Sequence, residues 1–158
     1  MPNKAETFAR SETHINLMRA FAGESQARNR YTIAAGMARE KNLYVVQQVF
    51  LFTADQELTH AKQFYRQLAD LSGQTVRADG TYPVDLYPDL LSHLRAAQHN
   101  EFQEWEHDYA HFAKTASEEG FPWWPSCSTP LQASSASTAS GSAASPICWS
   151  GRSCSSPP

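Results

Sequence analysis

Five side chains before residue 105 combine types and spacings that suit a metal centre. Glu57 and His60 form a Glu-x-x-His pair, and Glu101 and Glu104 form a Glu-x-x-Glu pair. Residues three apart share one face of an α-helix, so each pair can reach a single site. Glu24 supplies a further carboxylate. Oxygen-rich ligand sets with one or two imidazoles suit iron or manganese, and the pattern therefore predicts a carboxylate-bound pair of such ions.

The predicted ligands continue apolar stripes that should face the interior of a helical bundle. The stripes are Leu17, Phe21, Glu24, Arg28, Tyr31 and Ala35; Val46, Val49, Phe50, Thr53, Glu57, His60, Phe64, Leu68 and Leu71; and Leu90, Leu94, Ala97, Glu101, Glu104 and Phe112. A buried carboxylate without a partner is unfavourable by several kcal/mol, and converging carboxylates also repel one another. Two divalent ions would match four carboxylates in charge.

Other interpretations of these residues remain open at this point. A single Glu-x-x-His or Glu-x-x-Glu is common on solvated helix faces, and Arg28 could pair with Glu24 across one turn. Four further histidines are predicted to be surface or capping residues, although the last of them lies on an inner face: His93, His99, His107 and His111. The metal interpretation is favoured because three separate helices carry their acids at similar depth on their buried sides.

Three long helices are predicted to position these side chains. They run over about residues 14–39, 43–71 and 89–118, and a capping signal at Ser11 to Thr13 opens the first. Ser72 and Gly73 should end the second helix, and Gly120 with Pro122 should end the third. Residues 74–88 contain Gly80, Pro83 and Pro88 and are too long for a tight helical hairpin. The pattern therefore indicates an all-α bundle with a crossover connection between its second and third long helices.

Composition excludes several classes of partner and location. The net charge of −3 gives no electrostatic basis for binding nucleic acid or an anionic membrane surface. No apolar run approaches the roughly 20 residues that span a bilayer. The N-terminus lacks the apolar stretch of a signal peptide, which makes the cytoplasm the expected location. Three cysteines, Cys127, Cys148 and Cys154, are too far apart for a Cys-x-x-Cys motif.

The composition changes abruptly after Pro122. Residues 123–158 are rich in Ser, Ala, Pro and Thr, and Arg152 is their only charged side chain. Such a segment buries too little apolar surface to offset the entropy of ordering it. We therefore expect one helical domain over residues 1–122 and a disordered, low-complexity tail over residues 123–158.

Three segments that carry the predicted ligands resemble the rubrerythrin family. Residues 16–31 read NLMRAFAGESQARNRY, residues 54–62 read ADQELTHAK, and residues 101–121 read EFQEWEHDYAHFAKTASEEGF. The resemblance covers about residues 4–122, and its motifs are specific. It implies a ferritin-like bundle, of which three long helices are present while the tail stands in place of the fourth.

The resemblance also implies roles for individual residues. Iron would be bound by Glu24, Glu57, His60, Glu101 and Glu104, and Glu57 would bridge the two irons. Tyr31 and Tyr109 stand where the family has tyrosines that hydrogen-bond ligand carboxylates, although ordinary core aromatics would look the same in the sequence. Rubrerythrins reduce hydrogen peroxide to water with two electrons, which a donor protein such as a rubredoxin supplies. Association as a homodimer is expected as well.

The chain departs from the family pattern after Glu119. No acid and no histidine follows that residue, so a second Glu-x-x-His of the family is absent, as is a pair of Cys-x-x-Cys motifs. Our hypothesis is that the tail is an out-of-frame translation of a GC-rich gene, and the alternative is a natural disordered extension. Without these ligands, we expect weak or substoichiometric metal binding and low or absent peroxidase activity.

Two functions of other classes compete with the di-iron enzyme. A ferritin-like protein that binds and stores iron would need to assemble into a shell, which light scattering can test. A metal-free helical interaction module would tolerate replacement of its buried acids by Gln or Leu. The metal-binding functions require the carboxylates of Glu24, Glu57 and Glu101, whereas the interaction module does not.

Overall fold

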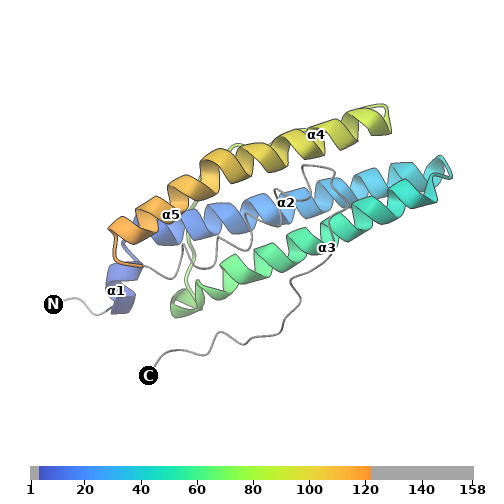
Figure 1. Ribbon diagram of the computed structural model, residues 1–158. Coiled ribbons are helices and arrows are strands. Elements are labelled where there is room, and N and C mark those ends of the chain that lie inside the picture. The colour runs from blue at the N-terminus through green and yellow to red at the C-terminus, as the bar shows by residue number, and fades with distance from the viewer. Residues whose placement is uncertain (1–3, 122–158) are drawn as a thin grey trace, which may run out of the picture.

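The computed structural model describes residues 4–121, apart from the side chains of Trp105 and Glu106. All regular elements in this range are helical, as predicted (Figure 1). They are α1 (Lys4–Phe8), α2 (Glu12–Glu40), α3 (Tyr44–Arg66), the 3₁₀ turn η1 (Ala69–Leu71), α4 (Leu90–Gln103), the π-helical turn η2 (Glu104–Asp108) and α5 (Tyr109–Glu118). The predicted tail and its two explanations lie outside the described residues.

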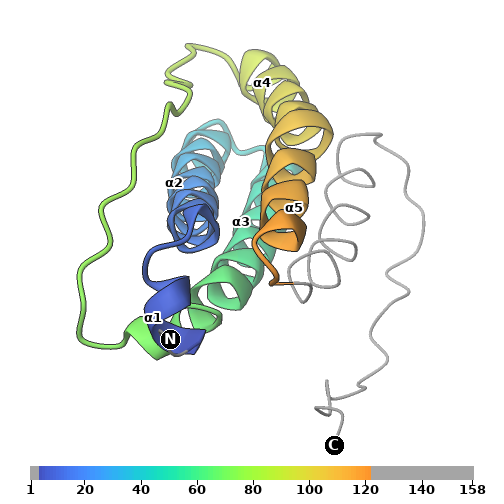
Figure 2. The ribbon, with the colours of Figure 1, turned by 90° about the vertical axis from the view of Figure 1, so that its left-hand side faces the viewer.

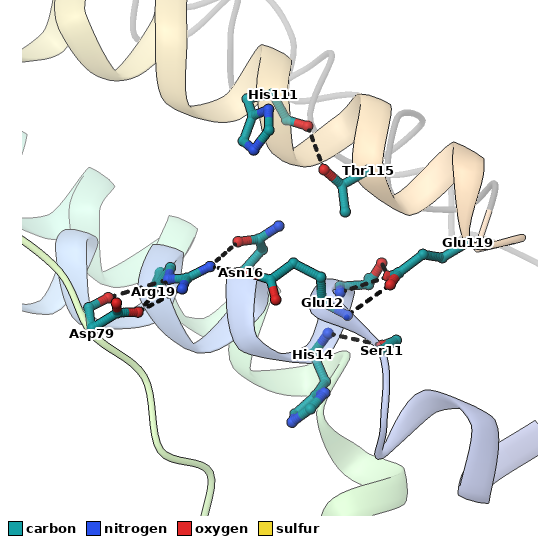
Figure 3. Close-up of polar contacts among 10 residues, drawn as sticks. Ser11, Glu12, His14, Asn16, Arg19, Asp79, His111, Thr115 and Glu119 are labelled. Atoms are coloured by element: carbon teal, nitrogen blue, oxygen red, sulfur yellow. Dashed lines mark hydrogen bonds and ion pairs between the residues drawn. The ribbon is translucent and has the colours of Figure 1, made fainter.

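Local capping explains where α2 begins and how it joins α3. The Ser11 hydroxyl accepts a hydrogen bond from the amide of His14 at 3.2 Å, which confirms the predicted N-cap. The Glu119 carboxylate, at the end of α5, accepts further bonds from the amides of Glu12 (2.7 Å) and Thr13 (2.8 Å) (Figure 3). At the other end, Asn42 adopts a positive φ of 57°, which asparagine tolerates better than most residues. This turn lets α3 return alongside α2.

The second long helix ends earlier than predicted. It ends at Arg66 rather than Leu71, because the amides of Gln67 and Leu68 bond three residues back and tighten the chain. The η1 turn that follows keeps Leu68 and Leu71 buried. The apolar pattern therefore continued past the end of the helix.

The third long helix is interrupted by a π-helical turn that the sequence did not predict. It starts at Leu90, where the Asp89 carboxylate accepts a bond from the amide of Ser92 at 2.9 Å. From Glu104 to Asp108 the backbone takes π-helical geometry, and the amide of Tyr109 donates to the carbonyl of Glu104. Gly120, at φ 83°, ends the helix as predicted.

The crossover over residues 74–88 contains no helix, as predicted, and follows the outer side of α2 (Figure 2). An ion pair between Arg19 and Asp79 attaches its first part to α2. A second ion pair, between Arg30 and Asp85, attaches its last part. The crossover is thus anchored to the same helix at two points.

Two apolar clusters fill the bundle on either side of a polar layer. The first comprises Phe8, Leu17, Ala20, Phe64, Leu68, Leu71, Tyr109, Ala116 and Phe121. The second comprises Ala27, Tyr31, Ala34, Ala35, Ala38, Phe50, Ala54 and Leu90. Along α2, Glu24 falls between the residues of the two clusters, and Glu57 and His60 do so along α3. The clusters therefore enclose the predicted ligands from both ends.

Some residues of the predicted inner stripes lie elsewhere. Val49 is 51% exposed, Leu94 is 38% exposed, and Arg28 is exposed rather than directed inward. His93, predicted to be a surface or capping residue, is buried, and its Nε2 atom lies 3.0 Å from the Tyr87 carbonyl. His111 is exposed. Stripes read at steps of three and four include both edges of a helix face, and packing covers only the middle.

Among the described helices, none is long and apolar enough to cross a membrane. The cytoplasmic location remains a prediction.

Candidate metal centre

The polar layer brings the predicted ligands together from three long helices. Glu24 comes from α2, Glu57 and His60 come from α3, and Glu101 lies near the end of α4. Glu24, Glu57, His60 and Glu101 expose 1%, 3%, 7% and 5% of their surface. Glu104, the first residue of η2, is partly buried. Such burial of several acids is rare unless a cation or protons compensate the charge.

Three of these side chains converge closely enough to hold one ion. The His60 Nδ1 atom lies 3.5 Å from Glu24 Oε2 and 3.9 Å from Glu57 Oε2. Bonds of about 2.0–2.2 Å allow two ligand atoms of one ion to be at most about 4.4 Å apart. Both distances from His60 fall within this limit, and one ligand atom from each of the three residues lies within 4.8 Å of the others. Glu101 and Glu104 lie outside this group of three.

An unsatisfied oxygen at the centre of this group indicates a missing positive partner. Glu24 Oε2 is buried and makes no hydrogen bond of regular geometry among the described residues, although His60 Nδ1 lies 3.5 Å away. Its other oxygen, Oε1, accepts a bond from the Tyr109 hydroxyl. Buried acceptors are nearly always paired, so an orphan on a ligand-type residue needs an explanation. A metal ion bound to Oε2 would provide one, and the residues present fit an iron or manganese site.

The carboxyl pKa values show how strongly the layer resists negative charge. Burial raises the pKa of Glu24 to about 8, where the charge of Glu104 adds to the rise and a hydrogen bond to Glu57 opposes it. Burial, then the hydrogen bond and charge of Glu24, raises the pKa of Glu57 to about 11. Burial and the charges of Glu101 and Glu57 raise the pKa of Glu104 to about 8. Without a cation these groups therefore hold protons at neutral pH, and a bound metal would displace them.

His60 cannot replace that cation. Burial lowers its pKa, and the charges of Glu57 and Glu101 oppose this effect without reversing it. The neutral imidazole is favoured, and it is the form that binds metals. His60 therefore suits the role of a ligand better than that of a counter-ion.

Two buried tyrosines hold two of the acids. The Tyr31 hydroxyl donates to Glu101 Oε1 at 3.0 Å, and the Tyr109 hydroxyl donates to Glu24 Oε1. Burial raises the pKa of both phenols, so both remain protonated donors. Each bond joins two different helices: Tyr31 of α2 bonds to Glu101 of α4, and Tyr109 of α5 bonds to Glu24 of α2. The tyrosines thus help to orient the two carboxylates.

The π-helical turn explains how Tyr109 comes to face the layer. In a regular α-helix, a residue five positions after Glu104 would point about 140° away from it. A π-helical turn bonds residue i to residue i+5, which brings both closer to one face. Tyr109 is therefore buried, at 3% exposure, beside the acids.

Comparison with known proteins decides the family of this chain. The rubrerythrin family model matches residues 16–124. This chain belongs to the rubrerythrin family. The all-α, ferritin-like architecture predicted from the sequence is thereby confirmed.

The curated rubrerythrins that resemble this chain are longer than the matched region. Rubrerythrin of Clostridium perfringens is 44% identical over 113 residues, which cover 71% of this chain and 58% of that protein. Rubrerythrin of Porphyromonas gingivalis is 41% identical over 111 residues, which cover 70% and 54%. Nigerythrin of Nitratidesulfovibrio vulgaris is 33% identical over 109 residues, which cover 66% and 51%. The chain thus spans little more than half the length of these relatives.

Polar residues beside the candidate metal centre were missed from the sequence. Arg30, Asp85 and Asn100 form a partly buried hydrogen-bonded group next to Tyr31. Asp85 lies in the irregular crossover, where no periodic pattern marks an inward-facing position. The sequence shows Asp85 only as an acidic residue between apolar neighbours, and this pattern is too common to predict a buried contact.

Replacement of Tyr109 by phenylalanine tests the hydrogen bond to Glu24. The variant leaves a second oxygen of a buried carboxyl without a donor, so we expect the free energy of unfolding to fall by about 1–3 kcal/mol. Chemical denaturation of the metal-free protein measures this change. Tyr44→Phe is the matched control, because Tyr44 is 59% exposed and its loss should have little effect. Equal stability of the two variants would contradict the assigned role of Tyr109.

Proposed function

We propose that this chain is a non-haem di-iron protein of rubrerythrin type. Glu24, Glu57, His60, Glu101 and Glu104 would hold the iron, and manganese is the other ion that suits these ligands. The observation that carries the proposal is the buried convergence of Glu24, Glu57 and His60 around a carboxylate oxygen that makes no regular hydrogen bond among the described residues. Membership of the rubrerythrin family supports iron as the resident metal.

The reaction that we propose is the reduction of hydrogen peroxide. Hydrogen peroxide takes up two electrons and two protons, its O–O bond breaks, and two water molecules form. Ferrous iron would supply the electrons, and a redox partner such as a rubredoxin would restore them. The reaction needs a site that is shielded from bulk water and that protons can still reach. A buried layer between two apolar clusters would provide the shielding.

The protein's own residues would bind the metal ions and orient the ligand carboxylates. Glu57 lies within reach of both Glu24 and His60 and is our candidate for the carboxylate that bridges two ions. Tyr31 and Tyr109 would keep Glu101 and Glu24 in place while charge in the layer changes. Outer-shell donors of this kind commonly alter metal affinity by about 10- to 100-fold.

The number of available ligands limits what this chain should achieve. Residues 120–158 contain no Asp, Glu or His, so they cannot supply a second Glu-x-x-His. We therefore expect fewer than two irons per chain and slow peroxide turnover. Two copies of the chain would associate, which would cover exposed apolar side chains such as Phe52 on α3.

Metal analysis and a peroxide assay on the whole chain test this function. The protein is loaded anaerobically with ferrous iron, desalted and analysed for iron per chain. Peroxide consumption is then followed with a chemical reductant present. Iron at substoichiometric level that is oxidised by peroxide supports the proposal. Complete absence of iron would reject the metal centre, whereas two tightly bound irons with rapid turnover would reject the expected incompleteness.

A further inference from the structure

One carboxylate oxygen in the crossover connects two helices of the bundle beside the metal centre. Asp85 Oδ2 accepts hydrogen bonds from Arg30 of α2 and from the Asn100 side-chain amide of α4, the latter at 3.0 Å. The side chains of Asp85 and Arg30 are only 9% and 12% exposed. Asp85 therefore joins α2 to α4 from within the protein.

Both connections lead to the same pair of site residues. The guanidinium of Arg30 lies over the ring of its neighbour Tyr31, 5.6 Å from the centroid. Asn100 immediately precedes Glu101 on α4. Tyr31 in turn donates to Glu101 Oε1 at 3.0 Å. Asp85, Arg30, Tyr31, Glu101 and Asn100 thus form a closed ring of contacts that spans the gap between α2 and α4.

The other anchor of the crossover differs in burial. Asp79 pairs with Arg19, but its side chain is 87% exposed (Figure 3). Exposed ion pairs contribute little to geometry or stability, whereas removing one partner of a largely buried pair leaves the other charge without compensation. The two anchors attach the same segment to the same helix, so Asp79 provides an internal comparison for Asp85.

We infer that Asp85 is a positioning residue of the metal centre, which holds Asn100 and Arg30 so that Glu101 meets Tyr31 in the orientation that metal binding requires. This inference rests on the proposed function, because it concerns the same site. It assigns a role in metal binding to a crossover residue that is not one of the predicted ligands. The role is geometric, because the single oxygen Oδ2 of Asp85 accepts the bonds from both Arg30 and Asn100 and so sets their relative position.

Titration with Co²⁺, a spectroscopic probe for sites of this kind, tests the inference on the full chain. We expect Asp85→Ala and Asn100→Ala to weaken Co²⁺ binding by about tenfold, the lower end for groups that orient ligands. The visible Co²⁺ spectrum should change as well, because the coordination of Glu101 changes. Asp79→Ala should bind Co²⁺ as the wild-type chain does. Far-UV circular dichroism checks that each variant is folded.

Two variants distinguish the effect of the position of the Asp85 acceptor from the effects of its charge and of a loss of stability. Asp85→Asn keeps an oxygen acceptor in place but removes the charge, so it should bind Co²⁺ within about threefold of wild type. Asn100→Ala keeps the Arg30–Asp85 ion pair, so it remains informative if Asp85→Ala fails to fold. Binding by Asp85→Asn as weak as that of Asp85→Ala would overturn the geometric role.

The remaining outcomes distinguish this inference from the proposed function. Absence of Co²⁺ binding by the wild-type chain would reject the metal centre itself, and the inference with it. Wild-type binding that Asn100→Ala and Asp85→Ala both retain would reject the inference alone. A loss in Asp79→Ala equal to that in Asp85→Ala would also reject it, because any anchor of the crossover would then suffice.

Discussion

Replacement of Glu57 by glutamine is expected to abolish the stabilisation that metal confers, while the metal-free protein keeps nearly its original stability. Burial and the neighbouring Glu24 raise the pKa of Glu57 to about 11, so this side chain is a neutral acid at pH 7 in the metal-free state. Glutamine is a neutral side chain of similar shape. Only the loaded state needs the carboxylate, because metal ligands must be deprotonated.

The size of the effect follows from mass action. A ligand at 100 times its dissociation constant stabilises the folded state by about 2.7 kcal/mol, and Glu57→Gln should lose most of this. Thermal unfolding with and without Fe²⁺ or Mn²⁺ measures the difference. Glu118→Gln is the control, because the Glu118 side chain is 65% exposed and pairs only with surface Lys114 among the described ion pairs. A metal-induced shift that persists in Glu57→Gln would show that metal binds elsewhere.

The metal-free protein should become less stable as the pH rises from 6.5 to 8. Burial raises the carboxyl pKa values of Glu24 and Glu104 to about 8 and that of Glu57 to about 11, from 4.5 in each case. Between 4.5 and the raised value, the folded chain binds more protons than the unfolded chain. Stability is therefore complete below this window and is lost as the pH rises through it, by up to about 1.4 kcal/mol per pH unit for each carboxyl.

The choice of pH range and two controls make this prediction specific. Burial lowers the pKa of His60, so the contribution of His60 to stability is lost in the opposite direction, as the pH falls below its ordinary pKa of 6.5. Measurements above that pH therefore isolate the carboxyls. Glu57→Gln should show a shallower fall, and saturating metal should remove it because bound carboxylates no longer titrate. Unfolding temperatures that stay constant or rise between pH 6.5 and 8 in the metal-free protein would contradict the prediction.

The sequence alone located the long helices, but not the short α1, and the acids that lie inside them. Helical periodicity and capping are local properties, so Ser11 and Gly120 marked real helix ends. The placement of Glu24 and Glu57 on buried faces followed from their steps relative to apolar neighbours. The resemblance to rubrerythrins rested on the same segments and was confirmed by the family match.

Only the tertiary structure decided which polar groups meet. The π-helical turn at Glu104 breaks the local rule of the α-helix, and Tyr109 directly after it is buried. Val49 and Leu94 belong to apolar patterns but lie outside the packed surface. Asp85 lies in an irregular segment, where the partner of a side chain depends on the path of the whole crossover. Periodicity determines which way a residue points within one helix, whereas contacts between segments distant in sequence depend on how the helices pack together.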